Sequence, residues 1–165
     1  MAGRRSDLEH YSKVREGWLI DTSIISALMG SRPLHSGIAH FFENVPDVRL
    51  RLSVLTIGEL RKGIGLLPND FSTSETFARS KRSRLARKLD ELQSLWADRI
   101  LPISLEVAAK WGELSARYQH GGNIVPAIDG LIAATAYVYN LVVVSNDAFF
   151  PRMREHVIVY DPLRN

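Results

Sequence analysis

Short apolar runs alternate with helical patterns along most of this chain, and that alternation restricts the fold more than any other feature. Runs rich in Val, Ile and Leu predict five strands, over residues 18–20, 49–52, 100–103, 141–144 and 157–160. Apolar residues spaced by three or four predict helices over residues 56–67, 75–96 and 105–120, and a further helix from Pro126 onward. Strands that alternate with helices in this way are typical of a parallel sheet in one α/β domain.

The chain has 165 residues, of which 45% are hydrophobic, and it contains no cysteine. A chain of about 150 residues buries roughly two-thirds of the surface that its unfolded form exposes, so a core can stabilise it without disulfides or a structural metal. The longest charge-free apolar stretch, residues 131–144, is shorter than the ~20 residues that a membrane helix needs. We therefore expect no membrane segment, and the lack of cysteine fits a cytoplasmic location.

Residues 1–17 differ from the rest of the chain because they are polar and because no apolar run follows Arg4 and Arg5. A secretory signal needs such a run, so we expect none here. We interpret residues 1–17 as a polar, loosely ordered N-terminal extension ahead of one folded domain over residues 18–165.

Four carboxylates follow predicted strands. Asp21 ends the first strand in WLIDTS, and Glu59 lies in the first turn of the helix after the second strand in LSVLTIGEL. Asp129 lies in the first turn of the Pro126 helix in VPAIDGLIAATA, and Asp147 follows the fourth strand in LVVVSNDAFF. Active sites of open parallel sheets form beyond the carboxyl ends of the strands. We therefore expect the four acids to converge at one edge of the sheet.

Each acid, taken singly, has a stronger structural explanation. Asp21 and Asp147 have the residue type of helix N-caps, and Thr56 with Glu59 has the spacing of a capping box. Asp129 suits the positive end of a helix dipole. Taken together, four converging carboxylates would repel one another and would need a compensating cation. Oxygen ligands suit Mg²⁺ or Mn²⁺, ions that activate water and neutralise phosphodiester oxygens during phosphoryl hydrolysis.

Other site chemistries find little support. Without cysteine there is no thiol nucleophile, and the histidines lack the i, i+4 spacing of a helical zinc site. The chain has no phosphate-binding G-x-x-x-x-G-K-[ST] loop, no G-x-G-x-x-G after a strand and no G-x-S-x-G elbow. Ser23, two residues after Asp21, stands where an aspartyl-phosphate phosphatase would carry a second Asp. Gly63 and Gly65 fit the end of a helix.

The net charge of +3 is unevenly distributed. Residues 79–99 hold seven basic and three acidic residues, a balance of +4, which leaves 14 basic and 15 acidic residues elsewhere. Most of this basic run fits a solvated helix face, with Arg87 and Glu91 paired at i, i+4. A polyanion would nevertheless need cations, and the candidates for phosphate contacts are Arg61, Lys62, Arg82 and Arg84. We expect the aromatic residues Trp96, Trp111, Tyr118, Phe149 and Phe150 to pack in the core or between helices.

In the segments LIDTSIIS, TIGELRKGI, AIDGLIAATA and VVVSND, in that order and spacing, the chain resembles the PIN-domain family. Within the family it is most similar to the toxin branch, the VapC-like and FitB-like ribonucleases of bacterial toxin–antitoxin pairs. The resemblance runs from Trp18 to about Pro162. It implies a three-layer α/β/α sandwich with a central parallel sheet, and an acidic pocket that binds one or two Mg²⁺ or Mn²⁺ ions.

The resemblance also implies roles for single residues. Asp21, Glu59, Asp129 and Asp147 match the metal-binding acids, with Asn146 as the alternative to Asp147. Thr22 matches the polar neighbour that orients the first acid, and Ser145 stands where a similar hydroxyl often lies. Members of this branch cut RNA, commonly form homodimers and are neutralised by an antitoxin whose tail enters the acidic groove.

These observations lead to the expectation of a Mg²⁺-dependent endoribonuclease that acts as the toxin of a type II toxin–antitoxin pair. Two alternatives stay open on the residues alone. One is a catalytically silent RNA-binding or assembly module with the same fold, in which the acids only cap helices. The other is a Mg²⁺-dependent DNA nuclease or phosphatase, because the acids permit that chemistry equally well.

Overall fold

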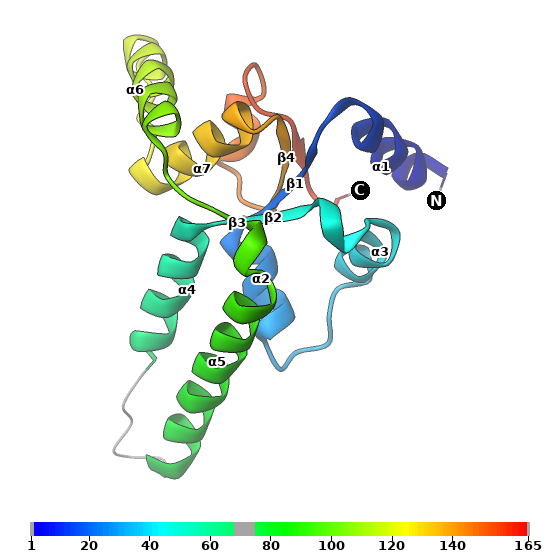
Figure 1. The fold of residues 1–165 in the computed structure, drawn as a ribbon, viewed down its shortest axis with the longest axis vertical. Helices are drawn as coiled ribbons and strands as arrows, with labels where there is room; N and C mark the ends of the chain where they lie inside the picture. Colours follow the sequence, from blue (N-terminus) through cyan, green and yellow to red (C-terminus); the bar gives the residue numbers. More distant parts are fainter. Residues whose placement is uncertain (1, 68–74, 165) are drawn as a thin grey trace.

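The computed structural model describes residues 2–67 and 75–164. Within these ranges, five parallel strands form one sheet in the order β3-β2-β1-β4-β5 (Figure 1). The strands are β1 (Gly17–Ile20), β2 (Leu50–Ser53), β3 (Ile100–Leu101), β4 (Leu141–Val144) and β5 (Val159–Tyr160). Trp18 of β1 lies opposite Leu50 of β2 and Val142 of β4. The five predicted strands are confirmed, although β3 and β5 are shorter than the runs that predicted them.

Seven α-helices surround the sheet in the described ranges. They are α1 (Ala2–Val14), α2 (Thr22–Met29), α3 (Ser36–Asn44), α4 (Val54–Gly65), α5 (Glu75–Leu95), α6 (Leu105–His120) and α7 (Ala127–Val138). Short 3₁₀ segments occur at η1 (Asp47–Arg49), η2 (Ala97–Arg99) and η3 (Phe150–Met153). The four predicted helices are confirmed. Helix α4 begins before the predicted Thr56, because the Ser53 side chain caps it by accepting a hydrogen bond from the Leu55 amide at 3.2 Å.

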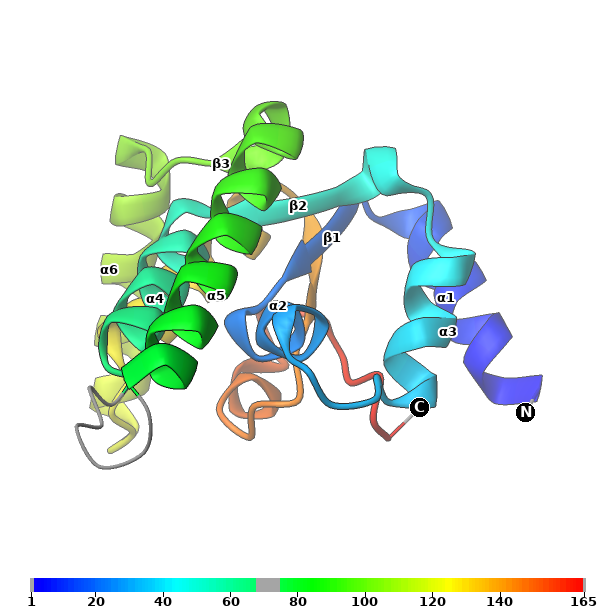
Figure 2. The ribbon, with the colours of Figure 1, turned by 90° about the horizontal axis from the view of Figure 1, so that it is seen from below.

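The helices form two layers, one on each face of the sheet: α6 and α7 lie above the sheet in Figure 1 and α2, α4 and α5 below it, and Figure 2 looks onto the lower layer. Side chains alternate between the faces along β1, so Trp18 and Ile20 belong to one core cluster and Leu19 to the other. The first cluster joins the sheet to helices α1 to α5, and the second joins it to α6, α7 and η3. The expected three-layer α/β/α sandwich is therefore confirmed.

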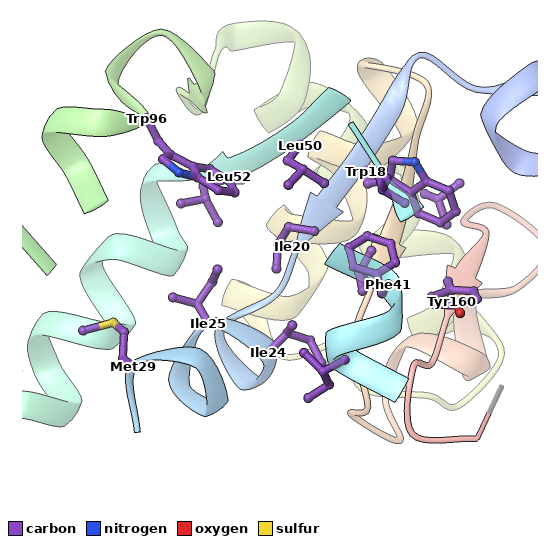
Figure 3. Close-up of a cluster of buried hydrophobic side chains, with 14 of the residues drawn as sticks. Trp18, Ile20, Ile24, Ile25, Met29, Phe41, Leu50, Leu52, Trp96 and Tyr160 are labelled. Carbon is purple, nitrogen blue, oxygen red and sulfur yellow. The ribbon is translucent and has the colours of Figure 1, made fainter. Parts of the chain in front are cut away.

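Three aromatic rings pack together at one end of the first core cluster (Figure 3). Trp18 contacts Phe41 of α3 with ring centroids 5.2 Å apart and Tyr160 of β5 at 5.6 Å, both edge to face. Such pairs contribute about 0.5–1.5 kcal/mol each beyond the area that they bury. This contact fixes α3 against the β5 edge of the sheet. Of the aromatic residues that were predicted to pack, Trp96 and Phe150 are buried.

Small residues let α7 approach its neighbours closely. Ala133, Ala134 and Ala136 are buried against the second core cluster, as predicted for a helix that lies close to the sheet. Gly130 instead makes room for α6. A Cβ atom at Gly130 would lie 2.6 Å from Val125 Cγ1 and 3.0 Å from Trp111 Nε1. The N-terminal turn of α7, which carries Asp129, is therefore held tightly against α6.

The described part of the N-terminal extension, residues 2–17, is more ordered than predicted. Residues 2–14 form helix α1, Leu8 is buried in the first core cluster, and the Tyr11 ring meets Trp18 edge to face at 6.2 Å. The Arg49 guanidinium donates to the Ser12 carbonyl oxygen at 2.7 Å and to the Arg15 carbonyl oxygen, at the negative end of the helix. The expectation of a loosely ordered extension was wrong because it weighed the polar composition above the apolar pair Leu8 and Tyr11.

No helix in the described ranges is long and apolar enough to cross a membrane.

Replacing Leu8 with Ala tests whether α1 is part of the core. Removing a side chain that is only 4% exposed leaves a cavity, so the free energy of unfolding should fall by about 2–4 kcal/mol. Urea denaturation measures this change. Val14→Ala on the same helix is the control, since Val14 is 49% exposed and its truncation should change stability by less than about 0.5 kcal/mol. Equal effects of the two changes would contradict the packing of α1.

Candidate acidic site at the carboxyl edge of the sheet

Asp21 stands at the point where β1 ends and α2 begins. Its amide donates to the Val144 carbonyl oxygen at 3.0 Å, so the pairing of β1 with β4 continues to this residue. Its carboxylate is nearly buried, and Oδ2 accepts hydrogen bonds from Ser23 Oγ at 2.9 Å and from Ser145 Oγ at 2.7 Å. Asp21 occupies the N-cap position of α2, but its side chain accepts no capping hydrogen bond from a backbone amide of that helix. The capping explanation for Asp21 is therefore wrong.

Glu59 lies on α4 and is held by a residue of another helix. The Thr22 hydroxyl donates to Glu59 Oε2 at 2.5 Å. Thr22 therefore orients the second acid, whereas the family resemblance assigned it to the first. The predicted capping box is also wrong: Ser53 is the N-cap of α4, so Thr56 lies inside the helix. Capping accounts for neither of these first two carboxylates.

Ser145 joins Asp21 to Asp147. Its hydroxyl donates to Asp21 and accepts from the Asp147 amide at 3.0 Å. Asp147 Oδ1 accepts from the Phe149 amide at 2.7 Å, which forms a local turn rather than a helix cap, because η3 begins only at Phe150. Asp147 and Asn146 are both exposed. The turn thus orients Asp147 at the rim of the site.

The pKa of Asp129 reflects its burial and the charges of the other three acids. Partial burial, the largest cause, acts together with the charges of Asp147, Glu59 and Asp21 to raise the pKa of its carboxyl from 3.8 to about 6. The N-terminal turn of α7 should by itself favour the ionised form, so the dipole explanation does not account for Asp129. All four predicted acids therefore share one electrostatic environment, although they come from four separate segments.

The acids are close enough to repel one another but do not form a closed ligand cage. In the described part of the chain, no three Asp, Glu, His or Cys side chains lie close enough together to hold a metal ion as they stand. The donor set consists of carboxylate and hydroxyl oxygens. Those donors suit Mg²⁺ or Mn²⁺ better than Zn²⁺, and the shared negative charge would favour a divalent cation.

Three of the predicted phosphate-binding residues have partners within the protein. Arg61 pairs with Asp90 of α5 at 2.8 Å, and Arg82 donates to the carbonyl oxygens of Gly65, at 3.3 Å, and Leu67. Arg84 donates to Ser31 Oγ at 2.8 Å. Lys62 is exposed on α4. The side chain of Arg79 lies outside the described residues.

Arg84 also lines a hollow of about 610 Å³ between α2, α3 and α5, whose lining includes Ser23, which donates to Asp21, and Asn146, which precedes Asp147. Arg32 and Lys81 line it too, and its described lining contains no carboxylate. We refer to it as the basic hollow. Ser23, Arg32 and Lys81 were not predicted as site residues; the spacing of Ser23 from Asp21 was the only local signal, because hydroxyls often bond a carboxylate two residues away.

Known proteins resemble the chain over most of its length. Toxin FitB of Neisseria gonorrhoeae is 31% identical over 147 residues, which cover 87% of this chain and 96% of FitB. VapC ribonuclease Y4jK of Sinorhizobium fredii is 28% identical over 130 residues, which cover 78% of this chain and 86% of that protein. The crystal structure of FitAcB from N. gonorrhoeae superimposes with a TM-score of 0.76 at 29% identity, covering 90% of this chain and 99% of that chain.

The sequence profile of the PIN domain matches residues 18–156. The matched range contains all four acids together with Thr22 and Ser145. The predicted resemblance is confirmed, and the chain belongs to the PIN domain family.

Proposed function

We propose that this protein is a Mg²⁺- or Mn²⁺-dependent endoribonuclease and the toxin of a type II toxin–antitoxin pair. The observation that carries the proposal is that side-chain hydrogen bonds orient Asp21 and Glu59 at the edge of the sheet where Asp129 and Asp147 lie; the raised pKa of Asp129 supports this grouping of four carboxylates from separate segments. Proteins do not collect like charges at a sheet edge for stability, because the repulsion is unfavourable unless a cation offsets it. The names VapC ribonuclease and Toxin FitB of the relatives support RNA as substrate and a toxin role.

Asp21, Glu59 and Asp129 would hold the ion, and Asp147 or Asn146 would complete the site. The effect of Asp147 on the Asp129 carboxyl supports Asp147. When bound, a divalent ion lowers the pKa of a coordinated water and neutralises the phosphodiester oxygens. Ser23 and Ser145 fix Asp21, and Thr22 fixes Glu59, so two ligands are oriented before the ion arrives. Asp147 at the rim would orient the attacking water.

The basic hollow would hold phosphates of the RNA strand next to the acids. Its lining includes Ser23 and Asn146, which adjoin the acids in sequence, and the cations of Arg32, Lys81 and Arg84. Arg61 and Arg82 contribute less, because their guanidinium groups already join α4 to α5 and to the segment that follows it. An anionic strand could thus approach four carboxylates while its neighbouring phosphates meet positive charge.

The solved structures that resemble this chain support a protein partner. The neighbouring structures include FitAB bound to a DNA fragment and VapBC of Salmonella typhimurium bound to DNA, which are two-component assemblies. We propose that this chain likewise binds a cognate antitoxin, whose tail enters the acidic site, and that it acts as a homodimer in the cytoplasm.

A cleavage assay with Asp21→Asn tests the reaction. Purified protein should cut structured RNA with Mg²⁺ or Mn²⁺ and lose activity with chelator, and Asp21→Asn should lower the rate by about 100-fold or more, since a hydrogen-bonded anionic ligand is lost. Ser145→Ala should lower it by about 10- to 100-fold. Asp98→Asn is the control, because the Asp98 side chain is 84% exposed on η2.

The same assay separates the alternatives. Cleavage that persists in chelator or in Asp21→Asn would exclude the proposed mechanism. Metal-dependent cleavage of DNA but not RNA would identify a DNA nuclease, and hydrolysis of phosphomonoesters alone would identify a phosphatase. RNA binding without cleavage under any metal condition would identify the silent module.

The pKa of Asp129 predicts how stability depends on pH. Because the folded-state pKa lies near 6 and the unfolded value near 3.8, the folded protein binds the extra proton, and metal-free stability falls as the pH rises from about 4 to about 6. Asp129→Asn lacks this charge, so in chelator it should unfold at a higher temperature than the wild type above pH 6. Thermal unfolding between pH 4.5 and 8 measures the difference.

That difference should shrink below pH 5, and Mg²⁺ should raise the unfolding temperature of the wild type more than that of Asp129→Asn. Asp98→Asn again serves as the control. A variant that is less stable than the wild type at every pH would contradict the shared field of the four acids.

The basic hollow is tested by Arg84→Gln combined with Lys81→Gln. Loss of two phosphate contacts should weaken RNA binding and reduce the slope of log affinity against log salt by about 1–2. Arg87→Gln on the same helix is the control, because Arg87 pairs with Glu91 at 3.9 Å and does not line the hollow. Equal slopes for the wild type and both variants would place the RNA elsewhere.

A further inference from the structure

A second, smaller hollow lies on the other face of the sheet from the basic hollow, since residues of the second core cluster line it and residues of the first line the basic hollow. It has a volume of about 300 Å³ and lies between the end of α6, the segment that joins α6 to α7, and the segment after β4. Tyr118, Asn123, Phe149 and Arg152 line it, with Met153 buried beneath them. Its described lining contains no carboxylate. We refer to it as the aromatic hollow.

The aromatic hollow is connected to the site at two points. The amide of Phe149 donates to Asp147 Oδ1 at 2.7 Å, so the turn that orients this carboxylate also orients the Phe149 ring. The segment of residues 121–126 leads directly into α7, whose first turn carries Asp129. Gly130 packs against Val125 and Trp111, which ties that segment to the position of Asp129. The lining of the hollow is therefore joined, through a hydrogen bond and through the backbone, to the segments that carry Asp147 and Asp129.

The walls of the hollow are held in place before any ligand binds. The Tyr118 hydroxyl lies 3.3 Å from His156 Nδ1, and Arg117 Nη1 lies 3.2 Å from His156 Nε2, so His156, itself held by Arg117, fixes the ring of Tyr118. Phe149 meets Phe150 edge to face at 5.6 Å. Both Tyr118 and Phe149 are half-buried against the second core cluster, as predicted for packing residues. Each therefore offers a fixed partial ring surface to the hollow, which lowers the entropy cost of binding.

The chemistry of the lining selects among ligands. Metal ions find no anionic oxygen there, and a chain of phosphates would find only one cation, Arg152. Two aromatic rings, a carboxamide and one guanidinium are the groups that proteins use to bind an unstacked nucleobase and its adjoining phosphate. The Asn123 side-chain nitrogen donates to the Gly121 carbonyl oxygen at 3.2 Å, which orients the carboxamide. The volume suits one base rather than an extended peptide.

We propose that the aromatic hollow binds one unpaired nucleobase of the substrate RNA, next to the phosphate that is cut, and thereby sets the base preference of cleavage. The base stacks on Phe149 or Tyr118, Asn123 contacts its polar edge, and Arg152 contacts a phosphate beside it. This inference rests on the proposed ribonuclease function. The two hollows then have different roles: the basic hollow binds backbone phosphates of the RNA, and the aromatic hollow binds one base.

Phe149→Ala is the main test, with a library of unstructured RNA of random sequence as substrate. Loss of one stacking contact should lower kcat/KM by about 5- to 100-fold, and the base preference at the cleaved bond should flatten. Phe149→Tyr keeps an aromatic ring and should restore both rate and preference. Asn123→Ala should change which base is preferred with a smaller loss of rate. Tyr137→Ala, an exposed aromatic residue on α7 outside both hollows, is the control.

The outcomes separate this inference from the proposed function. If the wild type does not cleave RNA with any metal, the proposed function fails. If the wild type cleaves with a base preference that Phe149→Ala and Asn123→Ala leave unchanged, the function stands and the aromatic hollow is not the base site. Circular dichroism and the unfolding temperature of each variant show whether a loss of activity reflects folding, and in that case the preference of the residual cleavage still decides.

Discussion

Backbone pairing between β1 and β4 is the interaction on which the rest of the site depends. The Asp21 amide continues that pairing to the Val144 carbonyl oxygen at 3.0 Å, which brings the residue after β1 beside the residue after β4. Asp21 and Ser145 then lie within hydrogen-bond distance at 2.7 Å, although 124 positions separate them. Since Ser145 also accepts from the Asp147 amide, one backbone register sets the relation of two acids. A slip of one residue in β1 would move Asp21 to the opposite face.

Several cationic side chains stabilise the fold by donating hydrogen bonds to backbone carbonyl oxygens at helix ends. Lys88 of α5 donates to the Met29 carbonyl oxygen at 3.0 Å, at the negative end of α2, and Arg82 does the same beyond the end of α4. Arg49 likewise donates to backbone carbonyl oxygens at the C-terminal end of α1. These contacts satisfy carbonyl groups that a helix end leaves without partners. The basic run of residues 79–99 is thus in large part structural, and the +4 balance of that segment overstates the charge available to a nucleic acid.

The sequence predicted the strands best. A strand that is buried on both faces must be apolar throughout, so the apolar runs identified the central strands, and the position of the four acids followed from the strands that precede them. Helices α2 and α3 carried weaker signals because each has only eight or nine residues, and α1 was hidden by its polar surface. The sequence could not predict that Thr22 bonds Glu59 rather than Asp21, because this contact depends on how α2 packs against α4. Side-chain partners across elements are a tertiary property, and local spacing does not encode them.

The raised pKa of Asp129 connects the stability of the fold with the chemistry of its edge. Burial and the charges of Asp147, Glu59 and Asp21 together raise the pKa of this carboxyl to about 6, and the sheet tolerates this because the strands that precede the acids are buried. A divalent cation would offset the repulsion among the four carboxylates and draw them together. Under the proposed function, substrate phosphates would add negative charge to the same edge. A bound cation would therefore favour their approach at the acids, in addition to the positive charge that the basic hollow offers to neighbouring phosphates.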